Sequence, residues 1–110
     1  MKEKTSFLKN KIDVDSPNKN IVPVTTTIDS TNHLSIGGCS IKDLVSKYDS
    51  PLYVLDETTL RNSCRAYKKA LEKYYPGVSL PIYASKANSS IFMSNLVASE
   101  GFGLDAVSEG

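Results

Sequence analysis

The stretch PIYASKANSSIFM, residues 81–93, decides how the second half of this sequence folds. Its apolar start predicts a short strand that runs into a single lysine, Lys86. The polar run NSS then offers capping oxygens for a helix from about Ser90 to Glu100, with Gly101 as the residue that ends it. The stretch therefore predicts a β/α unit with a lysine at the carboxyl end of its strand.

The same alternation continues on both sides of this stretch. Upstream, PLYVL at residues 51–55 is typical of a compact buried strand, and Asp56 is placed to cap a long helix after it. That helix, ended by Pro76 and Gly77, carries an apolar stripe made of Leu60, Cys64, Tyr67, Leu71 and Tyr74. Downstream, FGLDAVS at residues 102–108 predicts a further strand. Short loops between strands and helices indicate the α/β fold class, with a parallel sheet or barrel.

The first half of the sequence has a different character. Residues 1–20 are polar and lack a period, which predicts a mobile tail. We expect a strand at IVPVTTTI (residues 21–28), a turn at DSTNH and a short strand at LSIGG (residues 34–38). Residues 41–48 place Ile41, Leu44, Val45 and Tyr48 on one helical face. The predicted domains are therefore a tail (1–20), strands and a short helix that precede the barrel (21–50), and the first β/α units (51–110).

Composition excludes several classes of function. The 110 residues carry a net charge of +1, so no strong field favours nucleic acid or a membrane surface. No apolar run approaches the roughly 20 residues of a membrane helix, and the N-terminus lacks the core of a signal peptide. Cys39 and Cys64 lack metal-site spacing, which favours free thiols in a cytoplasmic protein. His33 is expected in a surface turn.

Lys86 has two interpretations from its position alone. Active residues of parallel β/α folds collect at the carboxyl ends of strands, and an uncharged lysine there is a nucleophile toward carbonyls. Alternatively, Lys86 only begins a solvated loop.

The local sequence resembles a known family. YASKAN (83–88), followed by GFGLDAVSEG (101–110) and preceded by SPLYVLDETTLR (50–61), is similar to the cofactor-lysine segment of pyridoxal-phosphate decarboxylases with the alanine-racemase-like barrel. The resemblance extends over residues 34–110. It implies a pyridoxal-phosphate-binding (β/α)8 TIM barrel, of which this chain carries only the N-terminal part. The last predicted strand has no helix after it, which fits the opening of a longer protein.

The resemblance also assigns roles to residues. It implies that Lys86 is catalytic and carries pyridoxal 5'-phosphate covalently on its ε-amino group, with Asp105 on the next strand as a cofactor-binding residue that balances the charge of Lys86. The alternative for Asp105 is a solvent-facing residue at a strand end. Asn88 is expected to cap rather than to contact substrate, and Ser108 and Glu109 receive no firm role.

Within the group, the resemblance implies decarboxylation of meso-2,6-diaminopimelate to L-lysine by a homodimer. Sister enzymes that act on ornithine, arginine or carboxynorspermidine remain alternatives, as does a truncated product without activity. The partners expected are a small amino-acid substrate and a second subunit, with no nucleic acid, membrane or metal. We expect these residues to be inactive by themselves.

Overall fold

The computed structural model describes residues 20–109. They form two compact units, one that extends to Thr59 and one that begins at Leu60. The tail predicted at residues 1–20 lies outside the described residues, apart from Asn20, which occupies a turn.

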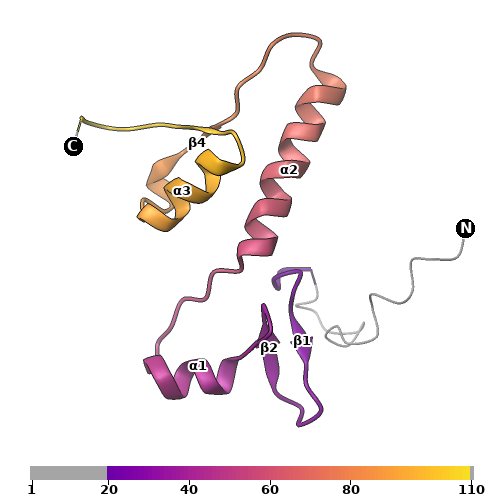
Figure 1. Ribbon diagram of the computed structural model, residues 1–110, viewed down its shortest axis with the longest axis vertical. Coiled ribbons are helices and arrows are strands. Elements are labelled where there is room, and N and C mark those ends of the chain that lie inside the picture. Colours follow the sequence, from indigo (N-terminus) through magenta and orange to yellow (C-terminus); the bar gives the residue numbers. More distant parts are fainter. Residues whose placement is uncertain (1–19, 110) are drawn as a thin grey trace, which may run out of the picture. The chain divides into compact units, whose positions relative to one another are not determined.

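The first unit contains an antiparallel sheet of three short strands in the order β1-β2-β3. These strands are Thr27–Ile28, Leu34–Ile36 and Cys39–Ser40, and Figure 1 shows the first two as arrows of a hairpin. The predicted turn between β1 and β2 is confirmed, since the Asp29 carboxylate accepts hydrogen bonds from the amides of Thr31 and His33, both at 2.9 Å. Two glycines with positive φ, Gly37 (59°) and Gly38 (79°), form the turn between β2 and β3.

The strand predicted at residues 21–28 is shorter than expected. Only its last two residues pair with a neighbour, at Thr27↔Ser35 and Ile28↔Leu34. Before them the carbonyl of Pro23 accepts the amide of Thr26 at 3.0 Å and closes a turn. β-Branched residues alone therefore did not fix a strand where a proline initiates a turn.

The sequence predicted a buried strand at residues 51–55, and this prediction is wrong. Within residues 20–109 this segment pairs with no strand, and the Tyr53 side chain is 100% exposed. A strand is defined by its hydrogen-bonded neighbour, which an apolar run does not supply by itself.

Helix α1 spans Ile41–Tyr48, the range predicted from the sequence. Ile41 and Leu44 are half-buried, whereas Val45 and Tyr48 are exposed, so only part of the predicted apolar face is covered.

Helix α2 spans Glu57–Tyr74, and Figure 1 shows it as the longest helix drawn. Asp56 caps it as predicted: the carboxylate accepts the Thr59 amide at 3.0 Å and also the Thr59 hydroxyl. Burial would raise the pKa of Asp56, but hydrogen bonds from Thr59 and Thr25 outweigh it and leave this pKa below its usual value.

The core of the second unit lies between α2 and α3, which spans Ile91–Ser99. Its buried residues are Cys64, Met93, Leu96 and Val97, with Leu60, Tyr83 and Phe102 packed against them. Cys64 is a buried free thiol, as the apolar stripe predicted. At the edge of the stripe Tyr67 is 59% exposed but places its ring 6.2 Å from that of Phe102, whereas Tyr74 is 74% exposed.

Strand β4 (Ile82–Tyr83) precedes α3 in the sequence, and strand β5 (Gly103–Leu104) follows it. The two strands pair in parallel, with Ile82 opposite Gly103 and Tyr83 opposite Leu104. The strand predicted to run into Lys86 ends earlier, because a 3-10 turn, η2, occupies Ser85–Ala87. Ser90 caps α3 by accepting the Met93 amide at 3.3 Å. The second unit is thus a β/α/β arrangement of mixed α/β class.

Candidate functional site

The candidate site lies at the carboxyl edge of the two parallel strands, entirely within the second unit. Beyond the paired residues Tyr83 and Leu104, one strand continues into the turn that carries Lys86 and the other into Asp105. The Asp105 amide donates to the Tyr83 carbonyl at 3.2 Å and extends the strand pairing by one bond. The topology therefore brings both residues predicted from the sequence to the same edge of the sheet.

The two side chains play different parts in this geometry. Lys86 is exposed, and within residues 20–109 its ammonium group makes no hydrogen bond or ion pair. Asp105 is engaged instead: its Oδ1 accepts the backbone amide of Ser85 at 2.6 Å. Hydrogen bonds from the Ser85 amide and hydroxyl, together with the positive charge of Lys86, hold the pKa of Asp105 below its usual value.

The loop that follows Lys86 is fixed by short-range hydrogen bonds. The Tyr83 hydroxyl donates to the Asn88 carbonyl at 3.3 Å, and the Asn88 side-chain oxygen accepts the Ser90 amide at 3.0 Å. Asn88 thus makes a local turn contact with Ser90, the residue that caps α3, and Tyr83 also packs against the core. The turn with Lys86 is held at both its ends, by Asp105 before the lysine and by Asn88 after it.

The other candidates from the sequence lie elsewhere or make no contact here. His33 sits in its exposed turn, where Nδ1 is 2.7 Å from the Thr31 hydroxyl. Ser108 and Glu109 are exposed. Residues 20–109 contain no group of three or more potential metal ligands, and none of their helices combines the length and apolar character needed to span a bilayer.

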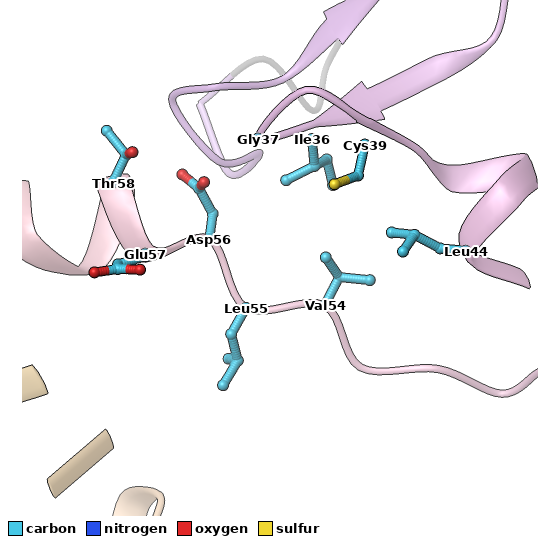
Figure 2. Close-up of a pocket in the computed structure, with 9 residues that line it drawn as sticks. All are labelled: Ile36, Gly37, Cys39, Leu44, Val54, Leu55, Asp56, Glu57 and Thr58. Carbon is cyan, nitrogen blue, oxygen red and sulfur yellow. The ribbon is translucent and has the colours of Figure 1, made fainter. Parts of the chain in front are cut away.

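A cavity in the first unit is not this site. It is lined by Ile36, Gly37, Cys39, Leu44, Val54, Leu55, Asp56, Glu57 and Thr58 (Figure 2). Figure 2 shows Val54 and Asp56 directed toward the strands of the sheet and Leu55 directed away. The Asp56 carboxylate is committed to its helix cap.

The second unit is thus a β/α/β arrangement with two parallel strands, and the lysine at their carboxyl edge makes no hydrogen bond or ion pair within residues 20–109. Residues 57–110 match the family model described as pyridoxal-dependent decarboxylase, pyridoxal binding domain. Both Lys86 and Asp105 lie within the matched range.

Curated relatives extend the match toward the N-terminus. The chain is similar to proteins named diaminopimelate decarboxylase: 48% identical over 86% of the chain in Synechocystis sp., 39% over 78% in Bacillus methanolicus and 42% over 71% in Bacillus subtilis. It covers 20%, 20% and 18% of those three proteins, so it spans about a fifth of the length of these relatives.

Sequence reasoning missed Ser85, the direct partner of Asp105. Ser85 acts through its backbone amide as well as its hydroxyl, and a backbone donor leaves no residue-type signal in a sequence. The spacing of nineteen residues between Lys86 and Asp105, across one helix, was the available clue that the two neighbourhoods meet.

Proposed function

We propose that this chain is part of a diaminopimelate decarboxylase, which removes carbon dioxide from meso-2,6-diaminopimelate to give L-lysine with pyridoxal 5'-phosphate as cofactor. The observation that carries the proposal is the similarity to relatives of that name over 71–86% of the chain, together with a family match whose range includes Lys86. The family match supports the cofactor class independently.

Lys86 is proposed as the residue that holds the cofactor. Its side chain is exposed and makes no hydrogen bond or ion pair within the described residues, so it is accessible to an aldehyde. Asp105 supplies a negative charge near it, as the effect of Lys86 on the pKa of Asp105 indicates. When bound, pyridoxal phosphate supplies the electron sink for decarboxylation.

The proposed architecture is a (β/α)8 TIM barrel of which these strands form part. One face of the β4–β5 sheet packs through Tyr83 and Phe102 against the helical core. On the other face Leu80 and Ile82 are 66% and 62% exposed, and a Cβ at Gly103 would lie 3.3 Å from Ile82 Cγ1. Parallel sheets are covered on both faces, so an apolar face with this exposure supports further strands and side chains packed onto it. The homodimer and the cytoplasmic location stay predictions.

The test uses the full-length protein that contains these residues. It is incubated with pyridoxal phosphate, reduced with borohydride and digested, and the peptide with Lys86 is examined by mass spectrometry for a pyridoxyl group. Carbon dioxide release is measured with meso-diaminopimelate and with ornithine. Lys86→Ala removes the proposed anchor, and Lys69→Ala, on an exposed position of α2, is the matched control.

We expect a pyridoxyl group on Lys86 in the parent protein and in Lys69→Ala, and activity on diaminopimelate that falls to background in Lys86→Ala. Activity on ornithine instead would favour a sister decarboxylase. Absence of both label and activity in the parent protein would favour a product without enzymatic function.

A further inference from the structure

The first amide of the turn that carries Lys86 is capped from a different strand. In η2 the Ala87 amide donates to the Ala84 carbonyl at 3.1 Å, which closes the turn. The preceding residue, Ala84, occupies the N-cap position, where serine, threonine, aspartate or asparagine would ordinarily supply a side-chain acceptor. Alanine has none, and the Ser85 amide finds its acceptor in the carboxylate of Asp105.

We propose that Asp105 is a positioning residue for Lys86, which fixes the lysine-bearing turn to β5 by accepting the Ser85 amide, rather than a group that acts on the cofactor directly. The inference rests on the proposed function for its catalytic meaning, because it takes Lys86 as the cofactor lysine. The hydrogen bond itself is independent of that function.

The contacts of Asp105 favour this role over a purely electrostatic one. Its Oδ1 lies 2.6 Å from the Ser85 nitrogen, and the Asp105 amide is anchored to the Tyr83 carbonyl. Backbone and side chain of one residue thus bracket the strand end just before Lys86. No ion pair joins Asp105 to Lys86 within residues 20–109, whereas the hydrogen bond from Ser85 to Asp105 holds the backbone next to the lysine.

This arrangement has a mechanical consequence. Lys86 is exposed and makes no hydrogen bond or ion pair within the described residues, so the position of its backbone decides where its amino group can reach. A bond to the adjacent residue from a paired strand limits the motion of that backbone, which is how a supporting residue keeps a reactive group in productive geometry.

Four substitutions in the full-length protein separate the two roles. Asp105→Ala removes acceptor and charge, whereas Asp105→Asn removes the charge and keeps an oxygen that can accept the Ser85 amide. Ser85→Pro removes the amide donor. Proline is tolerated here because Ser85 is the first residue of the turn, and because Ala84, with φ −77° and ψ 99°, has a conformation compatible with a following proline. Ser85→Ala keeps the amide and is its control.

The first readout is amide hydrogen exchange of the peptide with Ser85 and Ala87 in protein without cofactor. Loss of a charge-assisted hydrogen bond should speed exchange of this turn by about tenfold in Asp105→Ala, and by at most about threefold in Asp105→Asn. Because no cofactor is present, this readout stands whether or not the proposed function is correct.

The second readout is the rate at which borohydride-stable pyridoxyl accumulates on Lys86. We expect Asp105→Ala and Ser85→Pro to slow it by about tenfold, and Asp105→Asn and Ser85→Ala to stay within about threefold of the parent protein. Asp105→Ala in the Ser85→Pro background should add nothing, because both changes remove the same bond.

Each result decides the matter. Unchanged exchange in Asp105→Ala would overturn the proposal, and so would an Asp105→Asn variant as slow in labelling as Asp105→Ala, since charge would then matter more than the hydrogen bond. If Asp105→Ala does not fold, Ser85→Pro against Ser85→Ala gives the same decision. A parent protein that takes no label on Lys86 refutes the proposed function. In that case the exchange measurement still tests whether the hydrogen bond from Ser85 to Asp105 holds the turn.

Discussion

Gly101 is the residue at which α3 can end and the chain can turn into β5. Its φ is +79°, and the helix closes through hydrogen bonds from the Phe102 amide to Val97 (3.0 Å) and from the Gly101 amide to Ala98 (2.9 Å). A side chain here is penalised because this region of φ is unfavourable for L-residues; its Cβ would also lie 3.0 Å from Lys68 Nζ, the end of a flexible side chain that can shift.

We therefore expect Gly101→Ala to lower the free energy of unfolding of the full-length protein by about 1–2 kcal/mol. The measurement is a urea titration followed by circular dichroism. Gly77→Ala is the matched control, since Gly77 has no positive φ and a Cβ there would meet only the side chain of Tyr75, which is exposed and can move. Equal effects at the two glycines would contradict the role given to the left-handed conformation.

At the scale of elements, ion pairs and hydrogen bonds join α2 to Glu100 at the C-terminal end of α3. Glu100 accepts hydrogen bonds from Arg61 (2.7 Å) and from Arg65 (2.8 and 2.9 Å), and Lys68 donates to its carbonyl at 3.0 Å. Hydrogen bonds from Arg65 and then Arg61 lower the pKa of Glu100 from 4.5 to about 2. Cations at the C-terminus of α3 also complement its dipole.

This lowered pKa predicts how the contribution of the cluster depends on pH. The folded pKa lies below the unfolded one, so the stabilisation is complete above about pH 4.5 and is lost as the pH falls toward 2. Glu100→Gln should therefore lower the melting temperature of the protein clearly at pH 6, and the difference from the parent should shrink steadily below pH 4.5. Glu72→Gln, on an exposed position of α2, should have little effect at any pH. A pH-independent effect of Glu100→Gln would contradict this assignment.

The elements that the sequence predicted well are those with local signals. Asp56, Ser90 and Gly101 sit within one turn of the helix ends they fix, so the limits of α2 and α3 follow from short stretches of sequence. The segment at 51–55 failed because pairing depends on a distant strand. For the candidate site, the resemblance to the decarboxylase family implied that Asp105 lies near Lys86, but not that the Ser85 amide lies between them, since no side-chain pattern records a backbone donor.

At the scale of the whole molecule, the described residues bury little apolar surface. Only Cys64, Met93, Leu96 and Val97 are buried hydrophobic residues within 20–109, whereas Leu80, Ile82, Val78 and Val107 are among those largely exposed. Folding must offset the conformational entropy of every ordered residue, roughly 1–2 kcal/mol each for the backbone, and a core of this size offsets little of it. On the architecture proposed above, further strands and helices of the barrel would contribute the apolar contacts that stabilise these elements.

The corresponding prediction concerns these 110 residues expressed without any further sequence. We expect no cooperative thermal transition, strong binding of the dye ANS to the exposed apolar face, and no pyridoxyl label on Lys86 after borohydride reduction. The same measurements on the full-length protein should give a cooperative transition, weak dye binding and label on Lys86. A sharp, cooperative transition of the 110 residues with weak dye binding would show instead that this segment is a self-sufficient module, whose exposed apolar face needs no covering strands.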